Sequence, residues 1–353
     1  MKILVIQHKM IGDVLTTSLL FEALRSHFPE AQLDYLINSN TQPVIAYNPF
    51  IDKLWLFSKE MEASKSLYKS FRKSIKDEKY DVVIDVYAKL RSAFLAKHSG
   101  AKKRISYRKW YTKHLYTHTF TPRTISVLDE GLAIENRIML LEPLIDKIKS
   151  IPKPTIYLTS EELYKGKEIL KHSDIEFEKP LYMVGITGSS DQKTYPLPYM
   201  ATLLDALVHE TDGQLLFNYI PDQQNEADML YSMCSEKTQQ HIFKEVYGND
   251  LREFLGLTAH CDALIGNEGG AVNMAKALNI PTFSIFAPWI LKEAWNSYEA
   301  SGKNMSVHLK DFFPKIYTKH PKKYKNQAAN LYKQLSPDYI IPELKNFLSN
   351  FSS

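Results

Sequence analysis

Short apolar runs alternate with stretches of helical periodicity along the first half of the chain. The runs at residues 2–7, 33–38, 53–57 and 81–86 are expected as β-strands. Between the first two runs, apolar residues recur at helical spacing from Ile11 to Phe28. Strands joined by crossover helices predict a parallel sheet with helices on both faces.

The same alternation returns after a proline-marked linker at residues 150–154. Strands are expected at 181–186, 214–218, 263–265 and 282–286, and helices at 198–210, 224–235 and 271–278. The pattern predicts an α/β protein of two Rossmann-like, doubly wound parallel-sheet domains, with the carboxyl ends of their strands on either side of one cleft. We place the domains at residues 1–155 and 156–335, followed by a C-terminal helix at 336–353 that can pack back toward the first domain.

The composition is that of a globular protein of about two domains. The 353 residues are 44% apolar and 24% charged, which excludes a disordered chain and a collagen-like repeat. The two cysteines, Cys234 and Cys261, form no disulfide framework or metal-ligand pattern and fit a reducing compartment. No run approaches the roughly 20 apolar residues of a membrane span, and the N-terminus lacks a signal-peptide cleavage site, so we expect a cytoplasmic protein.

Basic residues concentrate between Val86 and Leu128, where the chain has no Asp or Glu. Aromatic residues are interleaved with the ten Lys and Arg side chains of this stretch. Such a field attracts an anionic partner, for example nucleic acid, an acidic glycan or an anionic membrane. The alternative is a solvated surface in a lysine-rich protein, and a second basic cluster at residues 315–325 has the same two interpretations.

The first candidate motif, Gly12-Asp13, follows the first predicted strand closely. Gly12 can adopt backbone conformations closed to other residues. Asp13 is expected at or near a helix N-terminus, at the carboxyl edge of the sheet, where it is either an N-cap or a catalytic carboxylate. Without a G-x-G-x-x-G pattern, the motif is not a dinucleotide fingerprint.

The second motif is a hydroxyl-rich loop after the strand at 181–186. Thr187, Gly188, Ser189 and Ser190 precede Lys193 in this loop. Small hydroxyl residues, backbone donors and one lysine suit a diphosphate. The alternative is a polar turn with Lys193 in solvent.

The third motif is a glycine turn between the strand at 263–265 and the helix at 271–278. Gly269 and Gly270 precede Ala271 at the start of the helix, a place where anions bind readily. Glu268 would repel a phosphate, so a ribose or sugar hydroxyl is its expected partner. The alternative is a strand-to-helix turn without a ligand.

In this order and at these distances, the three motifs resemble glycosyltransferase family 9, the ADP-heptose:lipopolysaccharide heptosyltransferases. The resemblance extends over residues 1–290 and is carried by residues 2–37, 48–57, 81–108, 185–196 and 265–286. It implies the GT-B fold of two Rossmann domains. It also implies inverting transfer of a heptose from ADP-heptose to a lipopolysaccharide inner-core acceptor.

The resemblance implies a role for each matching residue. Asp13 matches the general base, which takes the proton of the acceptor hydroxyl as the new bond forms. Lys193 matches the lysine that contacts the donor diphosphate, with Thr187, Gly188, Ser189 and Ser190 beside it. The second donor-binding motif of the family falls on Glu268, Gly269, Gly270, Ala271 and Asn273.

The chain departs from that motif at two positions. Gly269 stands where the family has Thr or Ser, and Asn273 stands where it has His. A further acidic residue of the family falls among residues 222–226. Because the chain has no Asp-x-Asp motif, we expect no metal, and no cofactor other than the nucleotide-sugar substrate.

The first domain is expected to bind the acceptor, because its basic stretch suits the phosphates and acidic sugars of a membrane-held lipopolysaccharide core. We assign Gly12, Lys102, Lys103, Arg104 and Arg108 to this site. The expected partners are a nucleotide-sugar donor, an anionic glycolipid and the inner leaflet of the membrane, with the protein a monomer, peripheral on its cytoplasmic face. No nucleic-acid-binding module accompanies the basic stretch, so nucleic acid is not expected as a partner.

Two other functions remain open from the sequence. The same fold could use another nucleotide-sugar donor for a surface glycan, since a different sugar needs only altered pocket contacts. A catalytically silent sugar-nucleotide-binding protein would account for Gly269 and Asn273, although Asp13 and Lys193 argue against silence.

Overall fold

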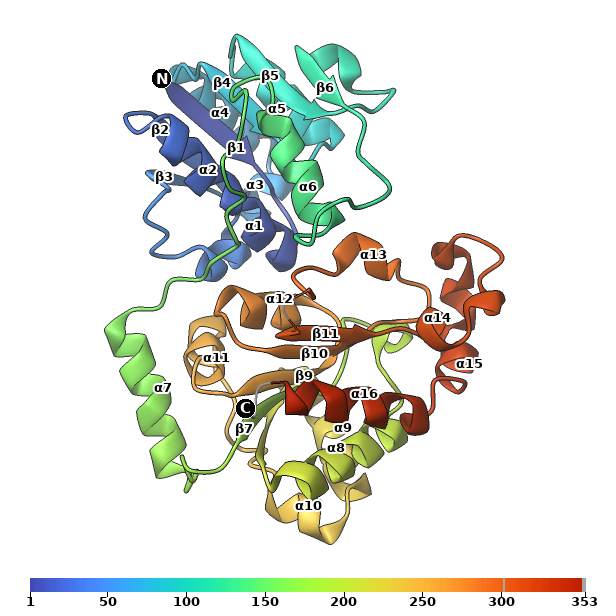
Figure 1. Ribbon diagram of the computed structural model, residues 1–353. Helices are drawn as coiled ribbons and strands as arrows, with labels where there is room; N and C mark the ends of the chain where they lie inside the picture. Colours follow the sequence, from blue (N-terminus) through green and yellow to red (C-terminus); the bar gives the residue numbers. More distant parts are fainter. Residues whose placement is uncertain (301, 351–353) are drawn as a thin grey trace. The chain divides into compact units, whose positions relative to one another are not determined.

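The chain folds into two α/β units, each built on its own parallel sheet (Figure 1). The computed structural model describes residues 1–300 and 302–350. The first unit runs from Met1 to Tyr157 and the second begins at Leu158, next to the predicted junction at residues 155 and 156. The predicted fold class, two Rossmann-like parallel-sheet domains, is confirmed.

The first unit has a six-stranded sheet in the order β3-β2-β1-β4-β5-β6, the strand order of a dinucleotide-binding Rossmann domain. Its strands are β1 (Lys2–Ile6), β2 (Gln32–Asn38), β3 (Lys53–Phe57), β4 (Val82–Asp85), β5 (Lys103–Tyr107) and β6 (His118–Phe120). Its helices are α1 (Ile11–Thr17), α2 (Leu19–His27), α3 (Lys59–Ala63), α4 (Lys65–Asp77), α5 (Leu90–His98) and α6 (Leu132–Ile138), with 3₁₀ turns η1 (Ser39–Val44), η2 (Lys113–Leu115) and η3 (Met139–Leu141).

Helices cover both faces of this sheet, which explains why its central strands are almost wholly apolar. The crossover from β1 to β2 runs toward one edge of the sheet, whereas those from β3 to β4 and from β4 to β5 run toward the other. Because such crossovers are right-handed, they place α1 and α2 on one face and α4 and α5 on the opposite face. Helix α6 packs on α1, in front of the sheet in Figure 1.

The helical pattern from Ile11 to Phe28 forms two helices rather than one. The break lies at Ser18, whose hydroxyl donates to the carbonyl oxygen of Leu15 at 2.7 Å. A serine side chain bonded back to its own helix competes with the backbone ladder, which accounts for the break.

The second unit has a five-stranded sheet in the order β11-β10-β9-β7-β8. Its strands are β7 (Leu181–Gly185), β8 (Gln214–Asn218), β9 (Ala263–Asn267), β10 (Thr282–Ile285) and β11 (Asn304–Val307). Its helices are α7 (Ser160–His172), α8 (Leu197–Thr211), α9 (Gln224–Met233), α10 (Glu236–Gln240), α11 (Leu251–Thr258), α12 (Gly270–Ala277), α13 (Lys292–Trp295), α14 (Leu309–Phe312), α15 (Ala328–Tyr332) and α16 (Pro337–Ser349), with 3₁₀ turns η4 (Asp191–Lys193), η5 (Pro221–Gln223), η6 (Pro314–Ile316) and η7 (Pro321–Gln327).

The C-terminal helix α16 packs within the second unit, beside α8 and β11. Ile340, Leu344 and Phe347 of this helix are buried in the core of that unit. The apolar face of α16 is therefore buried within the second unit. Among the described residues, no helix is long and apolar enough to cross a membrane.

Candidate functional site

Each sheet has a point at which the connections that leave two neighbouring strands lead toward opposite sides of the sheet. In the first unit it lies between β1 and β4, and in the second between β7 and β9. Doubly wound sheets bind ligands at these switch points, outside the carboxyl ends of the strands. The three sequence motifs follow β1, β7 and β9, so all three lie at a switch point.

Asp13 lies in the first turn of α1, directly after the carboxyl end of β1. It is the third residue of the helix, and Met10 occupies the N-cap position. One carboxylate oxygen, Oδ1, accepts a hydrogen bond from Nη2 of Arg137 at 2.7 Å. The other, Oδ2, lies 3.5 Å from the backbone nitrogen of Met10. The side chain is 27% exposed, so this carboxylate is reachable from solvent.

Arg137, which the sequence analysis missed, is the main partner of Asp13. Its side chain is only 8% exposed. Besides Asp13, it donates from Nε to the hydroxyl of Thr17 at 2.9 Å and from Nη1 to the carbonyl of Ala133 at 2.7 Å. The available signal was its position in α6, where an arginine falls among apolar residues at helical spacing.

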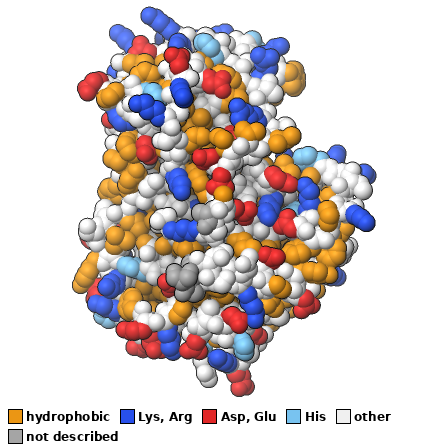
Figure 2. Space-filling model, viewed as in Figure 1, with side chains coloured by type: hydrophobic (Ala, Val, Ile, Leu, Met, Phe, Trp, Pro, Cys, Tyr) orange, Lys and Arg blue, Asp and Glu red, His pale blue; other side chains and the backbone are white. Residues whose placement is uncertain are grey.

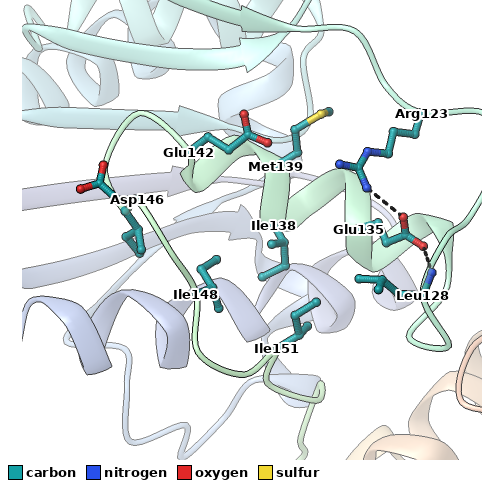
Figure 3. A pocket seen from close by; sticks show the side chains of 10 residues that line it. Arg123, Leu128, Glu135, Ile138, Met139, Glu142, Asp146, Ile148 and Ile151 are labelled. Atoms are coloured by element: carbon teal, nitrogen blue, oxygen red, sulfur yellow. Dashed lines mark hydrogen bonds and ion pairs between the residues drawn. The ribbon is translucent and has the colours of Figure 1, made fainter.

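A buried carboxylate positions the helix that carries Arg137. Glu135 accepts hydrogen bonds from the backbone nitrogens of Val127 and Leu128 at 2.9 and 3.0 Å, and pairs with Arg123 at 3.2 Å. Burial alone would raise the pKa of Glu135, but these donors and the Ser126 hydroxyl bring it below its ordinary value. Figure 3 shows Glu135 pointing toward Arg123 and Leu128, beside a pocket of about 210 Å³.

The five residues assigned to the acceptor divide between the carboxyl ends and the amino ends of the strands. Gly12 and Arg108 follow β1 and β5, at the same carboxyl edge as Asp13. Burial raises the pKa of Tyr107, the last residue of β5, to about 12. The nearby charge of Arg137 lowers this pKa and that of Asp13 raises it. Arg108 is exposed beside Tyr107 and donates from Nε to the Thr119 hydroxyl at 3.3 Å.

Lys102, Lys103 and Arg104 lie at the opposite edge, where β5 begins. Lys103 pairs in register with Val82, the first residue of β4. Its Nζ donates to the carbonyl of Pro143 at 2.9 Å, and the Arg104 guanidinium donates to the carbonyls of Leu115 and Ala101 at 3.0 and 2.6 Å. The sequence analysis assigned these three residues to one acceptor site with Gly12 and Arg108, but the structure separates them from those two by the length of a strand.

His8 is an uncharged aromatic residue at the carboxyl edge of the first sheet. Its ring stacks between those of Phe57 and Tyr87, with centroids 5.0 and 5.3 Å away. Nε2 is buried and has no hydrogen-bond partner among the described residues. Burial, with Arg91 and Lys9 adding to it, lowers the pKa of His8 to about 4.

We expect the pKa of His8 to make folding stability depend on pH. Below pH 6.5 the unfolded chain binds a proton at this residue, whereas the folded chain does so only near pH 4. As the pH is lowered from 6.5 to 4, the free energy of unfolding should therefore fall by about 1.4 kcal/mol per pH unit, relative to a His8→Phe variant. Denaturant unfolding of both proteins at a series of pH values measures the difference. Above about pH 7.5 the two stability curves should run parallel. Parallel curves between pH 6.5 and pH 4 as well would contradict the assignment.

In the second unit, the hydroxyl-rich loop leaves β7 and closes tightly on itself. A Cβ atom at Gly188 would lie 2.4 Å from the carbonyl oxygen of Lys193, so only glycine fits there. The backbone nitrogen of Gly188 donates to the Thr194 hydroxyl at 3.0 Å. Ser189 and Ser190 are exposed, and Thr187 is half-buried. The loop therefore holds Lys193 close to the end of β7 and leaves its hydroxyl groups accessible.

Lys193 does not extend into solvent but pairs with the third motif. Its Nζ lies 2.8 Å from Oε1 of Glu268, which follows β9. The same Nζ is 5.8 Å from the ring centroid of Trp289, and Nζ of Lys325 is 5.1 Å from that ring. Two lysines, one carboxylate and an indole thus meet at the carboxyl edge of the second sheet.

Asn267, the last residue of β9, connects the two donor motifs and was not foreseen. Its Nδ2 donates to the carbonyls of Gly185 and Ile186 at 2.9 and 3.1 Å. Its Oδ1 accepts from the backbone nitrogen of Tyr195 at 2.6 Å. These bonds fix the start and end of the hydroxyl-rich loop relative to Glu268. A buried asparagine beside a glycine-rich turn was the available signal.

The glycine turn leaves space in front of helix α12. A Cβ atom at Gly269 or Gly270 would meet no atom within 4 Å, so the space in front of the turn is open, although the backbone φ of 158° at Gly269 itself favours glycine. Ala271 and Asn273 lie in the first turn of α12 and are half-buried. The open space and the helix N-terminus behind it suit an anionic group.

The remaining predicted features are a family carboxylate and the absence of a metal site. Asp222 lies in η5 and Glu226 in α9, both after the carboxyl end of β8. Within residues 1–300 and 302–350, no three His, Cys, Asp or Glu side chains come together as metal ligands would.

Comparison with known proteins gives one family. The model of glycosyltransferase family 9 (heptosyltransferase) matches residues 68–324. The chain is 22% identical to lipopolysaccharide heptosyltransferase 2 of Salmonella typhimurium strain LT2 over 364 aligned residues, which cover 99% of both chains.

Solved structures resemble nearly the whole chain. A family 9 glycosyltransferase from Veillonella parvula superimposes with a TM-score of 0.72 at 17% identity, covering 94% of this chain and 97% of that one. An Escherichia coli heptosyltransferase with ADP superimposes with a TM-score of 0.70 at 13% identity, covering 98% and 100%. At these identities the structures support the fold, and the family rests on the sequence match.

Proposed function

Because this chain belongs to glycosyltransferase family 9, and is therefore a glycosyltransferase, we propose that it transfers a heptose from ADP-heptose to a lipopolysaccharide inner-core acceptor. Two of its sequence relatives are heptosyltransferases by name, and the match covers 84% and 99% of their lengths. The observation that carries the proposal is the accessible Asp13 carboxylate, held by the buried Arg137 at a switch point.

In this proposal Asp13 is the general base. An inverting transfer is a single displacement: the acceptor oxygen bonds to the anomeric carbon as the bond from that carbon to the ADP oxygen breaks. The acceptor hydroxyl must lose its proton in the same step, and a carboxylate on its side of the sugar can take it. Arg137 fixes Oδ1 of Asp13, which leaves Oδ2 as the oxygen that receives the proton.

The donor would bind the second unit. Lys193 supplies a positive charge for the diphosphate, and the exposed hydroxyls of Ser189 and Ser190 supply hydrogen bonds. The N-terminus of α12, behind Gly269 and Gly270, stabilises the charge that ADP gains as it leaves. A diphosphate that takes Lys193 also frees Glu268 to accept from a sugar or ribose hydroxyl. Asn273 contributes hydrogen bonds there but no charge.

The acceptor would bind the first unit beside Gly12 and Arg108, because these residues share the edge of the sheet with Asp13. A lipopolysaccharide core precursor is held in a membrane by its lipid. The protein would therefore work on the cytoplasmic face of the inner membrane.

Acceptor-dependent release of ADP tests this function. We expect purified protein to release ADP from ADP-heptose when heptose-deficient lipopolysaccharide is present and not when it is omitted, and to do so in EDTA. Release of UDP from a UDP-hexose instead would assign another donor. If no donor is consumed although calorimetry detects ADP binding, the protein is a silent nucleotide-sugar binder.

A further inference from the structure

Helices α4 and α5 share a face of the first unit that exposes several large apolar side chains. Leu90 and Phe94, one helical turn apart on α5, are 51% and 49% exposed. Trp110, in the segment after β5, is 85% exposed, and Leu67 near the start of α4 is also exposed. Large side chains so open to solvent, and so close in the fold, mark an interaction site.

Contacts between these segments make them one surface. Nζ of Lys109, next to Trp110, donates to the carbonyl of Ala88 just before α5 at 2.6 Å. Helix α5 also contacts η2, which follows Trp110, and packs beside α4. The guanidinium of Arg91 lies 5.2 Å from the ring centroid of Tyr68 on α4. We call this area the α4–α5 surface; it comprises the exposed residues of α4, α5 and the segment 109–113.

Basic side chains border the apolar ones along the same two helices. A groove of about 720 Å³ along α4 is lined by the basic residues Lys69, Arg72, Lys73, Lys76 and His98 and by one acid, Asp77. Of the acids nearby, Asp77 pairs with Lys73 at 2.7 Å, and Glu62 approaches Lys9 and Arg91 at 3.4 and 3.9 Å. Nε of Arg72 is buried and has no hydrogen-bond partner among the described residues. The groove thus has more positive charge than its own acids can neutralise.

The face of the molecule drawn in Figure 2 differs from this arrangement. There, basic and acidic side chains are intermixed over both units, so an anionic partner meets no continuous basic area. On the α4–α5 surface, by contrast, helix α4 contributes Lys65, Lys69, Arg72, Lys73 and Lys76 against the single acid Asp77. Helix α5 and the segment 109–113 contribute no acid.

We propose that the α4–α5 surface docks on an anionic lipid bilayer. Lysine and arginine attract the negative surface of such a bilayer, and exposed leucine, phenylalanine and tryptophan side chains enter the headgroup region. A soluble polyanion would use the cations but would leave Leu90, Phe94 and Trp110 in water. The combination of basic groove and apolar ridge therefore favours a membrane.

The inference rests on the proposed function and deepens it, because it states which part of the protein meets the membrane. Leu90 at the start of α5 and Trp110 after β5 lie at the carboxyl ends of the strands, where Asp13 also lies. The basic groove lies nearer the amino ends, where α4 and α5 finish. Docking through Leu90, Phe94 and Trp110 brings the lipid of the acceptor to the end of the first unit that carries the proposed base. The sugar part of the acceptor can then reach that base.

Vesicle binding by the full-length protein tests the proposal without relying on activity. We expect the protein to sediment with phosphatidylcholine vesicles that contain phosphatidylglycerol, and to be released by salt. The triple variant Lys69→Gln, Lys73→Gln, Lys76→Gln should bind these vesicles at least about tenfold more weakly. The double variant Phe94→Ser, Trp110→Ser should also bind more weakly. The control, Lys165→Gln, Lys167→Gln, Lys171→Gln on α7 of the second unit, removes the same charge from exposed lysines of one helix and should bind as the wild type does.

Tryptophan emission gives an independent reading. Vesicles should shift the emission of the wild type to shorter wavelength, and the Trp110→Phe variant should lose that shift. The proposal is overturned if the triple variant at Lys69, Lys73 and Lys76 and the double variant at Phe94 and Trp110 both bind vesicles as the wild type does. It is also overturned if only the α4 lysines matter and heparin binds equally well, because the partner is then a soluble polyanion. Activity on a delipidated acceptor is measured separately, so failure of the proposed function is distinguishable from failure of docking.

Discussion

Replacement of Asp13 by Asn is expected to lower kcat by a factor of about 10²–10⁴, the usual contribution of a general base. Asparagine keeps an oxygen that can accept from Arg137, so the helix start should stay in place while the proton acceptor is lost. The affinity for ADP should change by no more than a few-fold, because the donor residues lie in the other unit. Steady-state release of ADP and calorimetry with ADP measure the two quantities.

A matched control is Asp81→Asn, which changes a carboxylate at the opposite edge of the same sheet, where it binds the backbone nitrogen of Lys2. This variant should keep wild-type kcat. If Asp13→Asn also retains most of its turnover, the carboxylate serves only to pair with Arg137, and the base lies elsewhere.

Replacement of Lys193 by Ala is expected to weaken ADP binding by about 1.5–3 kcal/mol, the size of a hydrogen bond to a charged group. That loss corresponds to roughly 10- to 150-fold in Kd. The reason is that Lys193 is the cation held at the end of β7, beside the exposed hydroxyls and opposite α12. Calorimetric titration with ADP measures it.

Lys237→Ala serves as the control for this experiment, since Lys237 lies on α10 and points toward Asp212, which precedes β8 at the amino edge of the sheet. Its ADP affinity should equal that of the wild type. Equal affinity for Lys193→Ala as well would remove Lys193 from the donor site.

Much of the fold could be predicted because its elements have strong local signals. The run at 81–86 contains β4, and the helix expected at 198–210 is α8 at Leu197–Thr211. The strands β5, β6 and β11 were not predicted, because they are short and polar: β5 begins with Lys103 and Arg104 at an exposed end. The C-terminal helix expected at 336–353 is α16 at Pro337–Ser349, and its start agrees because a proline fits the first turn of a helix, where its missing N–H is not needed.

The candidate site was predictable only where motifs follow strands. Asp13, Lys193 and Glu268 lie in the segments that follow apolar runs, and the carboxyl ends of parallel strands lie at the same side of a sheet. Arg137 and Asn267 could not be placed in this way, because their partners are 124 and 82 residues away along the chain. The run Lys102–Arg104 has the charge of an acceptor site, but charge alone does not tell which end of a strand carries it.

The ion pair between Lys193 and Glu268 also bears on how fast the protein could cycle. The carboxylate is fixed beside the ammonium group, so it competes with every incoming anion at a high effective concentration. Inorganic phosphate and AMP, which lack the second phosphoryl group that can reach the neighbouring helix, would displace it poorly. After transfer, the same carboxylate can reclaim Lys193 as the spent nucleotide leaves. We therefore expect the ion pair to lower the affinity for the donor and to speed the release of the nucleotide product.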